Sequence, residues 1–116
     1  MKIVILDGYA LNPGDLSWAG MEALGEVAVY DRTSYVESPV IAEKIGDAEV
    51  AVVNKTPITK ATMDACPNLK AVAALATGYN VVDTAYAQEK GILLPYAPNN
   101  NLTFKTFFVN TFYKLF

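Results

Sequence analysis

Two short polar segments of the chain follow apolar runs and carry groups that could bind a carboxylate. Residues 54–56, Asn-Lys-Thr, offer an ammonium group and a hydroxyl, and residues 77–80 read Thr-Gly-Tyr-Asn. Gly78 would let a ligand approach the main chain closely, so that the N–H groups of Gly78 and Tyr79 could hold an anion. An ordinary strand-to-helix turn at 77–80 is the open alternative, because Gly and Asn tolerate positive φ. The candidate binding residues are Lys55, Thr56, Thr77, Gly78, Tyr79 and Asn80.

Short apolar runs alternate with helical signals through the first 95 residues. The runs consist of Val, Ile, Leu and Ala without alternating polar residues, which is typical of strands buried on both faces. They cover residues 3–6, 27–30, 50–53, 71–75 and 92–94. Capping residues, together with Gly and Pro as helix-ending residues, delimit four expected helices between these runs. The four run from Asp15 or Ser17 to Leu24, from Ser38 to Gly46, from Thr59 to Cys66 and from Asp83 to Gly91.

Five strands separated by four helices predict right-handed crossovers and a parallel sheet covered on both faces. We therefore expect a single α/β domain, a flavodoxin-like, doubly wound, open parallel sheet of five strands. All strands of such a sheet end at one edge, and ligands bind there near the point where the strand order reverses. Residues 7–9, 54–57 and 77–80 would share that edge. The fold thus brings both candidate segments to one rim.

The chain contains no histidine, and this absence removes several classes of active site. Ser-His-Asp and Cys-His pairs need an imidazole base, and histidine is also the commonest metal ligand. Cys66 precedes Pro67 and fits a small buried hydrophobe near a helix end better than a nucleophile. Arg32 is the only arginine and is interpreted as a solvated loop charge rather than a substrate clamp. We expect no catalytic residue and no metal site in this chain.

The glycines and the charge balance restrict the ligands and partners further. The glycine spacing fits neither G-x-G-x-x-G nor G-x-x-x-x-G-K-[ST], so we expect this chain to bind no nucleotide cofactor. A formal charge of −3 argues against nucleic acid or an anionic membrane as a partner. No apolar run approaches the roughly 20 residues that span a bilayer. With one cysteine and no secretory leader, the sequence predicts a cytoplasmic protein whose partners are small molecules or proteins.

A change of composition near Pro95 predicts a boundary. All acidic residues lie at or before Glu89, whereas all five phenylalanines lie at or after Phe104. We therefore expect a substrate-binding domain over residues 1–95 and a separate aromatic-rich tail over residues 96–116. Two interpretations of the tail stay open. Phenylalanine at every fourth position favours an amphipathic helix, whereas the abrupt loss of acids favours an out-of-frame or read-through end.

Three segments carry a resemblance to a known family. They are VVNKTPIT (52–59), ACPNLKAVAALATGYNVVD (65–83) and AQEKGI (87–92). In this order they resemble the amino-terminal part of the substrate-binding domain of the D-isomer-specific 2-hydroxyacid dehydrogenases, most of all the glycerate (hydroxypyruvate) dehydrogenase branch. The resemblance implies that Gly78 and Tyr79 donate backbone N–H groups to a substrate carboxylate and that residues 54–56 line the same cleft. It also implies a small 2-hydroxy or 2-oxo carboxylate as ligand, and NAD(H) and a homodimer for the full-length enzyme.

The chain also departs from this family. Enzymes of the family have a second domain with a glycine-rich dinucleotide-binding motif. Their catalytic arginine, acidic residue and histidine lie on or beyond that domain. None of these features is present in the 116 residues. The resemblance therefore implies a truncated, substrate-binding fragment that is inactive alone. A non-catalytic protein-binding module or a receiver-like module is the alternative. A receiver needs clustered carboxylates after the first strand, an aspartate at the end of the third strand and a lysine at the end of the fifth. Here the first place holds Asp7 alone, and the other two hold Asn54 and Pro95.

Overall fold

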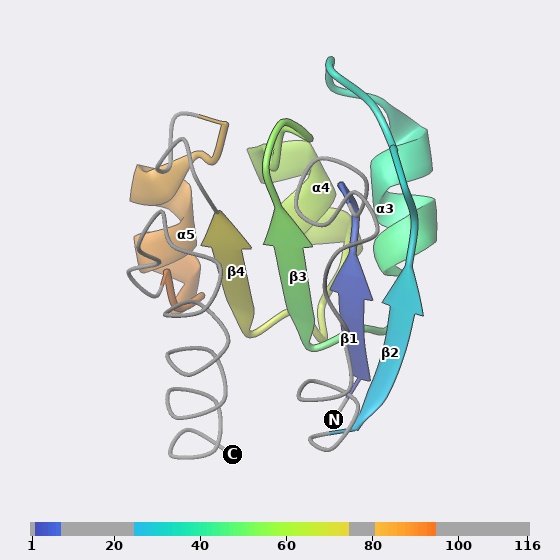
Figure 1. Ribbon diagram of the computed structural model, residues 1–116. Coiled ribbons are helices and arrows are strands. Elements are labelled where there is room, and N and C mark those ends of the chain that lie inside the picture. Colours follow the sequence, from blue (N-terminus) through green and yellow to red (C-terminus); the bar gives the residue numbers. More distant parts are fainter. Residues whose placement is uncertain (1, 8–24, 75–80, 95–116) are drawn as a thin grey trace.

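The computed structural model describes residues 2–7, 25–74 and 81–94, which form a parallel sheet with three helices (Figure 1). Each of the four strands has four residues, and all strands point the same way. The strands are β1 (Lys2–Ile5), β2 (Glu26–Val29), β3 (Val50–Val53) and β4 (Ala71–Ala74). The helices are α3 (Pro39–Ile45), α4 (Lys60–Ala65) and α5 (Thr84–Lys90). The predicted α/β class with a parallel sheet is confirmed.

The strand order in the sheet is β2-β1-β3-β4. β1 is central, because Ile3 pairs with Val27 of β2 on one side and with Val50 of β3 on the other. The run expected as a fifth strand, residues 92–94, makes one parallel bridge to β4, between Ala71 and Leu93. The Val72 N–H donates to the Leu93 carbonyl over 2.9 Å, and the Leu93 N–H donates to the Lys70 carbonyl over 2.9 Å. The segment thus extends the sheet at a single point, and a five-stranded sheet stays a prediction.

Local capping chemistry explains where the helices begin and end. Ser38 caps α3 by accepting a hydrogen bond from the Val40 N–H, and proline at the first helical position removes a donor that would have no partner. Asp83 caps α5 in the same way, by accepting from the Tyr86 N–H over 3.1 Å. Gly91 ends α5 at a φ of 76°, in the left-handed region that favours glycine. The three expected helices within the described residues are confirmed, whereas the one ending at Leu24 and the tail lie outside them.

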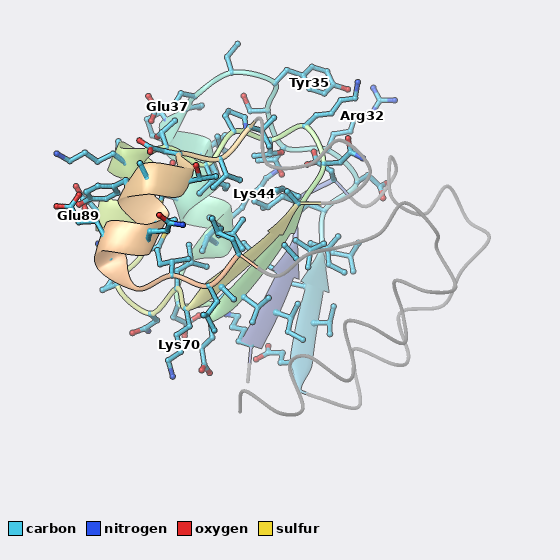
Figure 2. The ribbon with its side chains drawn as sticks, turned by 90° about the vertical axis from the view of Figure 1, so that its left-hand side faces the viewer. Arg32, Tyr35, Glu37, Lys44, Lys70 and Glu89 are labelled. Atoms are coloured by element: carbon cyan, nitrogen blue, oxygen red, sulfur yellow. The ribbon has the colours of Figure 1, made fainter. Side chains whose placement is uncertain are left out.

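All three described helices pack on one face of the sheet, which Figures 1 and 2 show from perpendicular directions. Successive strand residues point to opposite faces, so every second residue faces the helices. Val4, Ala51 and Val72 join Ile41 of α3 and Met63 of α4 in one buried cluster. The alternate residues of the central strands are equally buried, and they include Ile3, Ile5, Val50 and Val52. Burial on both faces explains why these strands are continuous apolar runs, whereas helices on the second face stay a prediction.

Candidate functional site

The carboxyl ends of β1 and β3 are joined by the side chain of Asp7. Oδ2 of Asp7 accepts hydrogen bonds from three consecutive backbone N–H groups, those of Asn54 (2.7 Å), Lys55 (3.0 Å) and Thr56 (3.0 Å). Oδ1 accepts a fourth bond from the Thr56 hydroxyl, over 2.8 Å. Asp7 is 3% exposed and Thr56 is fully buried. The loop that follows β3 is therefore wrapped around a buried carboxylate.

Four hydrogen-bond donors surround the buried carboxylate of Asp7. Among the described residues, none of the ion pairs Lys2–Asp47, Lys70–Glu49 and Lys90–Asp64 includes Asp7. Burying an ionised carboxylate is costly unless its oxygens are hydrogen-bonded, and hydrogen bonds to an ionised acceptor are the strong ones. Four donors converging on one side chain meet this requirement. The same arrangement leaves Asp7 poorly suited to accept a phosphoryl group and so does not favour the receiver-like interpretation.

The two predicted binding residues of this loop lie in different environments. The Thr56 side chain is buried, and its hydroxyl donates to Asp7. Lys55 directs its N–H inward to the same carboxylate, while its side chain is exposed. Lys55 is therefore the residue of this segment whose side chain a soluble anion can reach.

The loop after β3 is also hydrogen-bonded to the segment that follows residues 77–80. The Ile58 N–H donates to the Val81 carbonyl over 2.9 Å, and the Asp83 N–H donates to the Ile58 carbonyl over 3.0 Å. These bonds form a parallel bridge between Ile58 and Val82. The two candidate segments are thus connected through the residues that flank them. Thr77, Gly78, Tyr79 and Asn80 themselves lie outside the described residues, and their binding role stays a prediction.

A polar contact joins α4 to α5, the helices that follow the two candidate segments. The Tyr86 hydroxyl donates to Oδ1 of Asp64, and Nζ of Lys90 lies 3.2 Å from the same oxygen. Nζ of Lys60 lies 5.2 Å from the centre of the Tyr86 ring. The hydrogen bond to Asp64 raises the pKa of Tyr86 to about 12 and lowers the pKa of Asp64. This contact and the Asp7 contacts were missed from the sequence, and the one available signal was that Asp7 follows an apolar run at the same edge as residues 54–57.

The loop between β2 and α3 is held at the same edge of the sheet. The Thr33 hydroxyl donates to the carbonyl of Leu6, the residue that precedes Asp7, over 2.8 Å. Farther along the loop, Glu37 accepts a hydrogen bond from the Thr59 hydroxyl over 3.1 Å. Arg32 is exposed at this end of the molecule, as Figure 2 shows, and its interpretation as a solvated charge stays a prediction. The rim is thus connected to β2 as well as to β1 and β3.

Cys66 has the environment expected of a structural residue. It is 2% exposed at the end of α4, and burial raises the pKa of its thiol. A raised pKa disfavours the thiolate, which is the nucleophilic form. Within the described ranges, no group of three or more His, Cys, Asp or Glu side chains is arranged to hold a metal ion.

A polar hollow of about 550 Å³ lies at the opposite, amino-terminal edge of the sheet. Its lining side chains are charged or polar, and most of them are paired across it: Lys2 with Asp47 at 2.6 Å, and Lys70 with Glu49 at 3.1 Å. Figure 2 shows Lys70 at this end, away from Arg32, Tyr35 and Glu37. Strand ends that hold ligands in open parallel sheets are the carboxyl ends, so this hollow is not the candidate site.

The described residues do not fit a nicotinamide dinucleotide. A phosphate-binding turn needs glycines between a strand and the helix that follows it. The described glycines lie elsewhere, since Gly25 precedes β2, and Gly46 and Gly91 end α3 and α5. Within the same ranges, no helix is long and apolar enough to cross a membrane.

Comparison with known proteins gives matches over most of the chain. Residues 3–102 match the model of the D-isomer specific 2-hydroxyacid dehydrogenase catalytic domain. The chain is 58% identical over 92 residues to a hydroxypyruvate reductase of Blautia hydrogenotrophica, covering 79% of this chain and 29% of that protein. It is 36% identical over 91 residues to a glycerate dehydrogenase of Methylorubrum extorquens, and the match covers 78% of this chain and 27% of that protein.

Comparison with solved structures concerns the fold. The structure of the NAD⁺-bound 3-phosphoglycerate dehydrogenase of Entamoeba histolytica matches with a TM-score of 0.68 at 22% identity, over 84% of this chain and 33% of that one, and this likeness concerns the fold alone. The chain spans less than a third of the length of the two curated relatives. The match over residues 3–102 and the identity to these relatives establish that the chain belongs to the D-isomer-specific 2-hydroxyacid dehydrogenase family.

Proposed function

We propose that this chain is the substrate-binding part of an NAD-dependent D-2-hydroxyacid dehydrogenase that interconverts hydroxypyruvate and D-glycerate. The names of two relatives, hydroxypyruvate reductase and glycerate dehydrogenase, support this substrate pair. The observation that carries the proposal is the rim at the carboxyl edge of the sheet. There, an exposed lysine stands on a loop that is anchored to β1 by Asp7 and bridged to the segment after residues 77–80.

The proposed ligand is the carboxylate of a small 2-oxo or 2-hydroxy acid. Lys55 supplies a positive charge, and the N–H groups of Gly78 and Tyr79 supply directed hydrogen bonds. Thr77 and Asn80 complete the lining in this proposal, whereas the buried Thr56 side chain holds the loop through its hydrogen bond to Asp7. The two kinds of group have different roles. An ammonium group attracts an anion from any direction, whereas directed backbone N–H donors fix the orientation of the bound carboxylate.

The cofactor and the chemistry of the reaction are assigned to the rest of the full-length enzyme. NAD(H) supplies the hydride there. The 116 residues contain no histidine to act as a general acid, a contribution worth about 10²–10⁴-fold in rate. We therefore propose that the chain alone binds substrate and does not turn it over, and that the full-length enzyme is a cytoplasmic homodimer.

The fold proposal follows the same division. Adding the Leu93 segment beside β4 would give the strand order 2-1-3-4-5 of a flavodoxin-like sheet. We propose that residues 1–95 form this domain and that residues 96–116 are a separate aromatic tail.

Amide NMR titration with hydroxypyruvate and with D-glycerate tests the proposed function. We expect a dissociation constant of about 1 mM or weaker, because a ligand bound at an open rim stays partly hydrated. Chemical-shift changes should centre on residues 54–56 and 77–80. Lys55→Met should weaken binding severalfold, whereas Lys70→Met, which removes an ammonium group from the opposite edge, should not. Equal effects of the two substitutions, or shifts confined to the tail, would contradict the proposal, and so would oxidation of NADH with hydroxypyruvate by the chain alone.

A further inference from the structure

Three consecutive backbone N–H groups that point at one oxygen form a concave anion site of the kind that often binds a ligand. In this protein the three donors belong to residues 54–56, and the anion that fills the site is the protein's own Asp7. The three N–H···O distances lie between 2.7 and 3.0 Å, and the Thr56 hydroxyl closes the site at 2.8 Å. The site is buried, since Asp7 is 3% and Asn54 6% exposed.

The Asp7 carboxylate limits how a substrate carboxylate can bind at the rim. The N–H groups of residues 54–56 are committed to Asp7, so a substrate carboxylate at the rim cannot take hydrogen bonds from them. The middle donor belongs to Lys55, whose side chain is exposed while its N–H is bonded to the buried carboxylate. The backbone from which this side chain extends is therefore held by Asp7.

We propose that Asp7 is a positioning residue of the substrate site: it fills the amide site of residues 54–56 itself, so that the loop offers the Lys55 side chain, and not its backbone, to an anionic substrate. This inference rests on the proposed function for the identity of the substrate. It assigns to the loop after β3 a positioning residue from the segment that follows β1, 47 positions away from Asn54 in sequence.

The physical basis of the proposal is the charge of Asp7, which can be removed by substituting asparagine, a side chain of the same shape. An aspartate attracts all three N–H groups as an ion, whereas an asparagine offers a neutral carbonyl oxygen, which is a weaker acceptor. In Asp7→Asn the loop should loosen and Lys55 should sample more orientations, while the core beneath it stays packed. In Asp7→Ala the carboxylate is missing, and an added small carboxylate of the same size can take its place.

The experiment uses the 116-residue chain and the variants Asp7→Asn, Asp7→Ala and Thr56→Val, with Asp47→Asn as the matched control. Asp47 is an exposed carboxylate at the opposite edge of the sheet, paired with Lys2. Amide NMR follows two titrations, one with sodium formate against sodium chloride at equal ionic strength, and one with hydroxypyruvate. Urea unfolding of each variant fixes the conditions under which it is fully folded.

Four results are expected. Formate should shift the amides of residues 54–56 strongly in Asp7→Ala and at most weakly in the wild type, where Asp7 occupies their N–H groups and only the Lys55 side chain is open to an anion. Hydroxypyruvate should bind the folded Asp7→Asn variant about fivefold more weakly than the wild type, the size expected for a weakened charge-assisted contact. Thr56→Val, which loses one of the four donors, should show a smaller loss. Asp47→Asn should bind as the wild type does.

Two results would overturn the inference, and neither depends on the other. Formate that fails to reach residues 54–56 of folded Asp7→Ala would show that Asp7 is not the occupant of an anion site. An unchanged dissociation constant for hydroxypyruvate in folded Asp7→Asn, with only a lower urea midpoint, would show a purely structural role. A wild-type chain that binds no hydroxypyruvate would instead refute the proposed function, and formate binding at residues 54–56 of Asp7→Ala would still support Asp7 as the internal anion.

Discussion

Replacing Ile58 with alanine should destabilise the domain as strongly as a substitution in a strand, although Ile58 lies in the loop between β3 and α4. Its side chain is 0% exposed and belongs to the same buried cluster as Val4 and Met63. Ile→Ala substitutions at buried sites cost about 2–5 kcal/mol, depending on how far the surroundings collapse into the cavity. Here the Ile58 N–H and carbonyl are both hydrogen-bonded to the segment after β4, which restricts collapse. We expect a loss of about 3–4 kcal/mol in the free energy of unfolding.

The measurement is urea unfolding followed by circular dichroism, together with hydrogen exchange of the Asp83 N–H. Because a domain of this size has a total stability of about 5–15 kcal/mol, the expected loss should also lower the melting temperature by about 10 °C or more. The Asp83 N–H donates to the Ile58 carbonyl and should exchange faster in the variant. Val29→Ala is the control, because Val29 lies on edge strand β2 and is 41% exposed, and it should cost less than about 1 kcal/mol. A loss below about 0.5 kcal/mol for Ile58→Ala would refute the reasoning, since the bridge would then be a surface contact and not a part of the core.

Three further predictions concern the helix ends and the titrating groups. Asp83→Ala should cost about 1 kcal/mol in the free energy of unfolding by removing the cap of α5, whereas Thr59→Ala should cost less because Thr59 makes no capping bond to α4; equal losses in urea unfolding would contradict this. The pKa of Tyr86 is raised to about 12, above its unfolded value near 10, so its contribution to stability is complete below about pH 10 and is lost as the pH rises to about 12. Tyr86→Phe should therefore show a weaker loss of stability over this range than the wild type, and parallel pH profiles would count against the hydrogen bond to Asp64. Cys66 should stay unreactive toward an aromatic disulfide reagent in the folded chain and react on urea unfolding, and rapid labelling of the native protein would disprove its burial.

The helices were predictable because their signals are local. A serine before a proline, and a glycine seven residues beyond it, delimit α3 without reference to the rest of the chain. The α5 helix is delimited in the same way by Asp83 and Gly91. The central strands were predictable because continuous apolar runs of four residues are too short for helices and too apolar for loops.

The contacts that build the rim were not predictable, because they depend on how distant strands are placed. The bond from Asn54 to Asp7 exists only because β1 and β3 are neighbours in the sheet, in the register that pairs Ile5 with Val52. Nothing within either segment distinguishes a carboxylate that caps a distant loop from one that faces solvent. The same holds for Tyr86 and Asp64, whose contact follows from the packing of α4 against α5.

The nonlocal contacts have a common effect on the candidate site. Asp7 joins β1 to the loop after β3, Ile58 joins that loop to the segment before α5, and Asp64 joins α4 to α5. These contacts connect residues 54–56 and the helices α4 and α5 to neighbouring elements of the described structure. A weakly bound carboxylate gains most from groups that are already in place, because every side chain or loop that must be ordered on binding subtracts from the affinity. For the carboxylate site that we propose, the backbone of residues 54–56 is already held by four hydrogen bonds to Asp7, so its ordering subtracts nothing from the affinity.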